Sequence, residues 1–104
     1  MKYKIDLRDY VMPKANEKDK DKPYEVKRII FSVMLSPNQG HKGFRFYTIS
    51  KLAKRIRDRK EDFIILSEAD YNIIKGLFDS CTGFSAVDTE CVSRIYEPEI
   101  IDED

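Results

Sequence analysis

The sequence predicts a small α+β domain, mainly helical, with three to four helices and a minor two-stranded β element. Several segments space their apolar residues with helical periodicity, and two short segments, 2–8 and 62–66, have strand-like patterns. A chain of 104 residues that is 41% apolar can build one core but not two. We therefore expect a single domain over 1–104. The alternative is an all-α bundle in which both strand-like segments are merely extended.

The first 23 residues predict a strand and a loop. Tyr3, Ile5 and Leu7 alternate with charged residues, a pattern typical of a half-buried strand. Residues 13–23 hold one Ala as their only apolar side chain and are bounded by prolines, so we expect a mobile charged loop. Its acidic residues lack the central Gly of a calcium loop, and the interleaved lysines repel a cation, so we expect no metal there.

Two helices are predicted in the middle of the chain. Residues 24–35 are apolar on almost every side, with Pro23 suited to the first helical position and Pro37 beyond the end. We expect this helix at the centre of the core. After a loop at 36–46, a basic helix capped by Thr48 or Ser50 places its apolar residues on one face. That face consists of Ile49, Leu52, Ala53 and Ile56.

The second half predicts a strand and two capped helices. Residues 62–66 can pair with 2–8, and Ser67 then caps a helix over 68–81. Ser85 repeats the capping signature for a last helix at 86–96. We expect the acidic tail, 97–104, to be frayed.

The formal net charge of zero conceals two oppositely charged halves. Residues 1–60 hold 17 of the 19 basic residues and 7 of the 19 acidic ones, a net charge of +10, whereas 61–104 carry −10. Such asymmetry indicates interaction surfaces. The basic candidates for binding nucleic acid or an acidic partner are Arg45, Lys51, Lys54, Arg55, Arg57, Arg59 and Lys60, with Phe44, Phe46 and Tyr47 beside them. The candidates for an acidic partner-binding face are Glu68, Asp79, Asp88 and Glu90.

The chain offers no set of residues for catalysis. His41 is the only histidine, and no Ser, Cys or second His stands near it to form a nucleophile or a ligand set. Cys81 and Cys91 fit buried free thiols better than a disulfide or a metal site. The glycines around His41 do not form a phosphate-binding loop, because the required GxxxxGK[ST] string is missing. We expect no enzymatic activity and no cofactor.

The two predicted C-terminal helices do not fit a helix-turn-helix motif. Their connection contains Gly83, as such a turn often does. The second helix, however, offers mainly acids, with Arg94 as its one basic residue, and a recognition helix must approach phosphates. We expect an ordinary helix hairpin.

The layout of the chain resembles small bacteriophage proteins of unassigned function. The likeness covers about residues 26–96: an apolar helix at 26–35, a middle segment at 47–56, a Leu-Ser-Glu-Ala-Asp phrase that opens a helix within 65–75, and a Gly-aromatic turn at 83–87. The basic segment 42–60 departs from that layout. The resemblance implies an accessory protein that binds other proteins, in virion assembly or against a host target, and it supplies no catalytic residue.

Three functions remain as hypotheses. The first is a protein–protein interaction module that uses opposed basic and acidic surfaces and can also self-associate through charge complementarity. The second is nucleic-acid binding by 42–60, and the third is an acidic nucleic-acid mimic that inhibits a host protein. The apolar runs are far shorter than the roughly 20 residues of a membrane span, so we expect no membrane association and a cytoplasmic location, in the host cell if the protein is phage-encoded.

Overall fold

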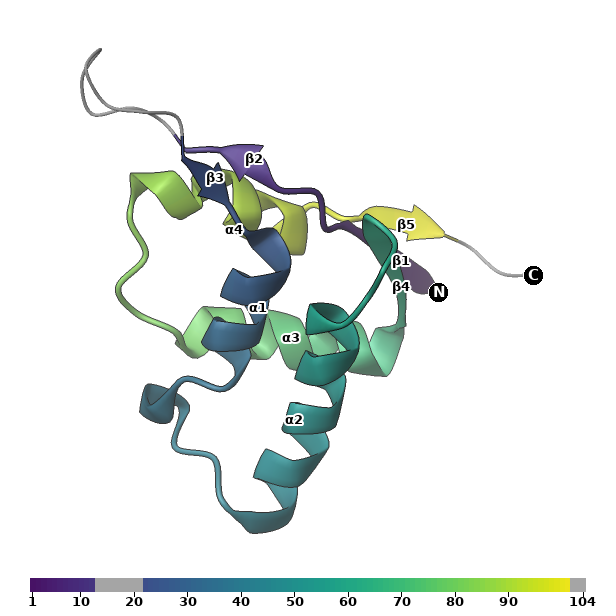
Figure 1. Ribbon diagram of the computed structural model, residues 1–104. Helices are drawn as coiled ribbons and strands as arrows, with labels where there is room; N and C mark the ends of the chain where they lie inside the picture. The colour runs from purple at the N-terminus through teal and green to yellow at the C-terminus, as the bar shows by residue number, and fades with distance from the viewer. Residues whose placement is uncertain (13–21, 102–104) are drawn as a thin grey trace.

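The computed structural model describes residues 1–12 and 22–101. Within these ranges the chain forms a mainly helical α+β fold, as predicted, so the all-α alternative is wrong (Figure 1). The strands are β1 (Lys2–Asp6), β2 (Tyr10–Val11), β3 (Pro23–Tyr24), β4 (Phe63–Ser67) and β5 (Glu99–Ile101). The helices are α1 (Val26–Met34), α2 (Gly43–Arg57), α3 (Glu68–Ser80) and α4 (Thr89–Tyr96), with the short 3-10 turns η1 (Pro37–Gln39) and η2 (Ala86–Asp88).

The predicted pairing of the two strand-like segments is confirmed. β1 and β4 are antiparallel, with Ile5 opposite Ile64 and Tyr3 opposite Leu66. These apolar side chains share the sheet face that packs on the helices, and the ring of Tyr3 stacks on Tyr71 of α3 at 4.0 Å between centroids. Alternation along each strand places the charged residues of β1 on the other face.

The β structure is larger than the predicted two-stranded element. β5 pairs with β1 on the side opposite β4, and β2 and β3 form a separate two-stranded sheet. The tail predicted to fray, 97–104, is therefore ordered as a strand at Glu99–Ile101, and 102–104 lie outside the described residues. Of the predicted mobile loop, 13–23, residues 13–21 also lie outside the described residues, and Pro23 belongs to β3.

Helix α1 starts later than predicted because a distant side chain caps it. Pro23 and Tyr24 form β3 and not a first helical turn, and the helix begins at Val26. The Val26 N–H donates to Oδ1 of Asp9 at 3.0 Å, which satisfies one of the N–H groups that a helix start leaves unpaired.

Helix α2 begins earlier than predicted. Gly43 is its first residue, and its φ of 46° suits a glycine at this sharp entry. Thr48 and Ser50, the predicted caps, lie inside the helix and donate to the carbonyls of Phe44 and Tyr47 in the preceding turn. The first turn was missed because its aromatic residues do not continue the buried stripe.

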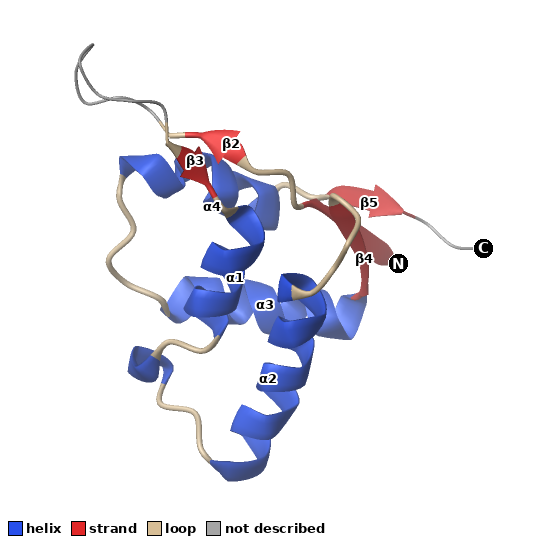
Figure 2. Cartoon of the chain, viewed as in Figure 1, coloured by secondary structure: helices blue, strands red, loops and turns tan. Residues whose placement is uncertain are grey.

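The last two helices follow the sequence closely. Ser67 caps α3, with its hydroxyl oxygen accepting from Asp70 N–H at 3.2 Å. Ser85 N–H donates to the carboxylate of Asp88 at 2.9 Å, which starts η2 and then α4. β2 and β3 lie at the top of the view and the three-stranded sheet lies at its right, whereas α2 extends away from them toward the lower end (Figure 2). All four helices, β1 and β4 contribute to one hydrophobic core.

Candidate interaction surface on helix α2

Helix α2 has two halves with different surroundings. Leu52, Ala53 and Ile56 are buried in the core, and Ile49 is the first buried residue of the helix. The six residues before Ile49 are all exposed. The first turns of α2 therefore extend beyond the core, at the lower end of the molecule (Figure 1).

The exposed half of α2 is aromatic. The side chain of Phe44 is 81% exposed, and those of Phe46 and Tyr47 are also exposed. Phe44, Tyr47 and Lys51 follow i, i+3, i+7 spacing, so they share one side of the helix, away from the core. The ring centroids of Phe44 and Tyr47 lie 6.3 Å apart, and Nζ of Lys51 lies 4.6 Å from the Tyr47 centroid. We define the α2 surface as Lys42, Phe44, Arg45, Phe46, Tyr47 and Lys51.

Three of the predicted basic residues are neutralised by acids of the same chain. Arg55 pairs with Asp70 of α3 at 3.1 Å. Arg57 pairs with the adjacent Asp58 at 2.8 Å, and its guanidinium lies over the ring of Phe31. Arg59 pairs with Glu61 at 3.2 Å and donates to the carbonyl of Phe63. These arginines of the C-terminal half of α2 and the turn after it are therefore already paired, and a partner would have to compete with acids of the same chain for them.

The other predicted basic residues keep their charge available. Within the described part of the chain, Arg45, Lys51, Lys54 and Lys60 make no ion pair, and neither does the exposed Lys42. Arg45, Lys51 and Lys54 lie on α2, whereas Lys60 lies beyond its end. Lys42 was not among the predicted site residues, although its place directly before the aromatic turn is a signal that the sequence contains.

A polar cleft borders the α2 surface on the side of α3. Its volume is about 430 Å³, and its lining includes Asn38, His41, Arg45, Asn72 and Gly76. Nε2 of His41 lies 2.8 Å from the carbonyl oxygen of Met34, so Nε2 carries the hydrogen and Nδ1 faces no partner in the described residues. A Cβ built on Gly76 would meet no atom within 4 Å. The cleft thus has an unpaired guanidinium at one wall and open space at the other.

The predicted acidic residues do not form one free surface. Asp79 accepts from the Tyr96 hydroxyl, and Asp88 accepts from the Tyr24 hydroxyl at 2.5 Å. Burial and the bond to Asp79 raise the pKa of Tyr96 to about 12, so its hydroxyl stays a donor at neutral pH.

The remaining two acids of this set are also separated. Glu90 forms an ion pair with Arg94 at 3.5 Å. Glu68 is exposed at the start of α3, about 16 Å along the helix axis from Asp79 at 1.5 Å per residue. Three of the four acids therefore support the fold, and only Glu68 has its carboxylate unengaged in the described residues.

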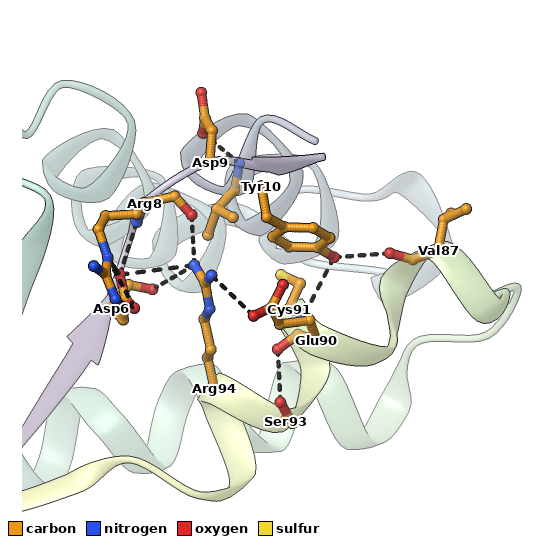
Figure 3. A network of polar contacts seen from close by, with 10 residues as sticks. Asp6, Arg8, Asp9, Tyr10, Val87, Glu90, Cys91, Ser93 and Arg94 are labelled. Atoms are coloured by element: carbon orange, nitrogen blue, oxygen red, sulfur yellow. Dashed lines mark hydrogen bonds and ion pairs between the residues drawn. The ribbon is translucent and has the colours of Figure 1, made fainter. Parts of the chain in front are cut away.

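A second cluster of charged residues surrounds Arg94 (Figure 3). The Arg94 guanidinium donates to the carbonyl of Arg8 at 2.5 Å, and it lies 3.8 Å from the carboxylate of Asp6. A cleft of about 440 Å³ lies beside these residues. The Arg8 guanidinium, hydrogen-bonded to Asp6, holds the pKa of that carboxyl below its usual value. A general acid needs the opposite shift, so this cluster holds the chain segment after β1 against α4 and does not suggest acid–base chemistry.

The other chemically distinctive residues are dispersed. Cys91 is buried and Cys81 is half-buried, and both are free thiols. Within residues 1–12 and 22–101 no group of three or more His, Cys, Asp or Glu side chains comes together to hold a metal ion. No helix of the described ranges is long and apolar enough to cross a membrane.

Comparisons of the chain with protein-family models, with curated proteins and with solved structures find no match. The α2 surface is a row of exposed aromatic side chains and of basic side chains that make no ion pair within the described residues, and it lies on and just before the part of α2 outside the core.

Proposed function

We propose that the protein is a non-enzymatic protein–protein interaction module whose α2 surface binds an acidic partner. The observation that carries the proposal is the exposure of Phe44, 81%, next to the exposed Phe46 and Tyr47. Solvent-facing aromatic rings in one patch cost solubility and have no role in the core. Aromatic and arginine side chains supply most of the binding energy in protein interfaces.

The positive charge of the α2 surface favours a partner that carries acidic residues. Lys42 and Arg45 have no acid beside them in the described residues, so a partner that brings carboxylates gains attraction without displacing an existing ion pair. The resemblance in layout to small phage proteins supports a role in virion assembly or against a host protein, in the cytoplasm of the host cell.

Capture of a partner tests the proposal. The tagged protein is incubated with an extract of the cells in which it occurs, and bound proteins are compared between the wild type and a Phe44→Ser, Tyr47→Ser double variant. Loss of two central aromatic side chains is expected to weaken binding more than about tenfold. Ile65→Ser is the matched control, because Ile65 is 41% exposed on the outer face of β4. Equal capture of the same protein by the double variant and the wild type would refute the proposal.

Nucleic-acid binding is the second candidate. It is favoured by five basic residues on or next to α2 that make no ion pair within the described residues: Lys42, Arg45, Lys51, Lys54 and Lys60. Two contacts weaken it. Lys51 lies over one side of the Tyr47 ring, where a base would stack, and Asp58 and Asp70 stand among the cations.

Filter binding at low ionic strength separates the two candidates. The protein-binding proposal predicts no retention of DNA or RNA. Retention that falls steeply with salt and is lost in an Arg45→Glu, Lys51→Glu variant would favour the nucleic-acid candidate. The nucleic-acid-mimic hypothesis has less support, because Asp79, Asp88 and Glu90 are held by contacts within the chain.

A further inference from the structure

Two exposed groups of opposite charge lie at different ends of the molecule. One is the α2 surface, with Arg45 beside its cleft. The other is the segment 97–101, which comprises Glu97 and strand β5. In Figure 1 this segment runs along the sheet, whereas the first turn of α2 is at the far end. Because of this separation, neither group can cover the other within one chain.

The segment 97–101 combines unpaired charge with exposed apolar surface. Glu97 is exposed and makes no ion pair within the described residues. Ile100 is 56% exposed, although it is an apolar residue in a strand. β5 pairs only with β1 in the described part of the chain, so its outer edge is open for a further contact.

The α2 surface offers the complementary groups. Arg45 makes no ion pair within the described residues, and its guanidinium can donate two parallel hydrogen bonds to a carboxylate. Asn72 supplies a side-chain amide in the same cleft, and Gly76 leaves its wall open. Phe44 and Tyr47 provide exposed rings next to the charge.

We propose that the α2 surface binds the segment 97–101 of a second copy of this chain. In this contact the Glu97 carboxylate enters the cleft and pairs with Arg45, and Ile100 packs on Phe44 and Tyr47. The inference rests on the proposed function and names its partner. Because the two surfaces differ, the contact is head-to-tail, and its repetition gives a ring or an open chain of copies.

The contact depends on charges at the protein surface, so salt weakens it. The Debye length falls from about 10 Å at 0.1 M salt to about 3 Å at 1 M. Sedimentation velocity at protein concentrations from about 10 µM to about 1 mM covers the affinities of small transient interfaces. We expect the weight-average sedimentation coefficient to rise with concentration at low salt and to stay at the monomer value near 1 M salt.

Charge exchange identifies the two residues. Arg45→Glu and Glu97→Lys are each expected to weaken self-association at least tenfold, and the double variant is expected to restore it to within about threefold of the wild type. Lys75→Glu, which makes the same change of charge outside the cleft, and Glu68→Lys are the matched controls. Each variant is first shown by circular dichroism to be folded.

Two substitutions of Gly76 that differ in side-chain size test the cleft independently of charge. Gly76→Leu would fill the open space and is expected to abolish association, whereas Gly76→Ala adds a single methyl group and is expected to leave it nearly unchanged. A monomer at every concentration in low salt would overturn the inference, as would association that neither charge variant weakens. If the protein is monomeric but the Phe44→Ser, Tyr47→Ser variant still loses capture of a different protein, the proposed function holds and only the identity of the partner is wrong.

Discussion

The Tyr24 hydroxyl donates a hydrogen bond of 2.5 Å to Oδ1 of Asp88, although 64 residues separate the two in the sequence. Tyr24 is 1% exposed, and its ring stacks on Tyr10 at 4.5 Å between centroids. The Tyr10 hydroxyl in turn donates to the carbonyl of Val87. The Cys91 N–H of α4 donates to the same Tyr10 hydroxyl, so these bonds hold the β2–β3 sheet against η2 and α4. The carboxylate of Asp88, a predicted candidate for binding a partner, is thus engaged inside the molecule.

Loss of the Tyr24 hydroxyl is expected to destabilise the protein. Tyr24→Phe leaves the ring stacking intact but removes one donor from the partly buried Asp88, which should lower the free energy of unfolding by about 1–2 kcal/mol. Urea denaturation measures this difference. Tyr3→Phe is the control, because within the described residues the Tyr3 hydroxyl donates only to the exposed Met1 sulfur, and its loss should cost less than about 0.5 kcal/mol. Equal stability of Tyr24→Phe and the wild type would contradict the structural role of the bond.

The distance along the chain between contacting residues explains which parts of the fold could be predicted from the sequence. The cap of α3 joins Ser67 to Asp70, three residues apart, and such a local pattern is visible in the chain. The cap of α1 comes from Asp9, seventeen residues before Val26, and no local pattern contains it. β5 was also missed, because a strand of three residues is too short to show alternation and because it lies in an acidic segment, with Pro98 directly before it.

The basic residues of the candidate site could be predicted from the sequence, but their ion pairs and the exposure of the neighbouring aromatic residues could not. The sequence predicted a basic helix with Arg45 in the loop before it, and five of the seven basic candidates, Arg45 included, lie on α2. It could not show that Arg55 is neutralised by Asp70, because that pair joins two helices across the fold. Nor could it show that Phe44 is left outside the core, although the spacing of Phe44, Tyr47 and Lys51 is a pattern that the chain contains.

The ion pair of Asp6 makes stability depend on pH in the acid range. Hydrogen bonds from Arg8 hold the pKa of Asp6 below its ordinary value, with Arg94 adding a smaller attraction. A carboxyl whose pKa is lower in the folded state than in the unfolded state contributes stability above its unfolded pKa of about 4. That contribution is lost as the pH falls through the folded pKa.

Comparison of the wild type with Asp6→Asn isolates this contribution. At pH 7 the variant is expected to be less stable by about 0.5–1 kcal/mol, a small value because Asp6 is near the surface and its charge is screened. The difference should shrink as the pH falls below the unfolded pKa of about 4 and through the lower folded pKa, since the wild-type carboxyl then becomes protonated. Urea denaturation at a series of pH values measures both, and parallel pH profiles for the two proteins would contradict the expectation.

The two thiols are expected to differ in reactivity. Burial raises the pKa of Cys91 to about 11, so at pH 8 only about one in a thousand of these thiols is a thiolate, and the side chain is 1% exposed. Cys81 is half-buried at the end of α3. An aromatic disulfide reagent should therefore modify one thiol per folded chain rapidly, and the second at least 100-fold more slowly.

A Cys81→Ser variant assigns the fast thiol. This variant should lose the rapid reaction and show its remaining thiol only after denaturation. Rapid modification of the folded variant would mean that Cys91 is accessible, and the packing of α4 against the core would then be looser than described.

Gly76 is expected to weaken helix α3. It lies inside the helix without a positive φ, so an L-residue fits the backbone, and a Cβ at this position meets no atom within 4 Å. Because glycine loses more backbone freedom on folding than alanine, Gly76→Ala should raise the free energy of unfolding by about 0.5–1 kcal/mol. Thermal and urea unfolding measure the gain. Gly83→Ala provides the contrasting case, because the φ of 90° at Gly83 strains an alanine and should lower stability. If Gly76→Ala were destabilising instead, other atoms would have to lie within 4 Å of the added methyl group at the wall of the cleft.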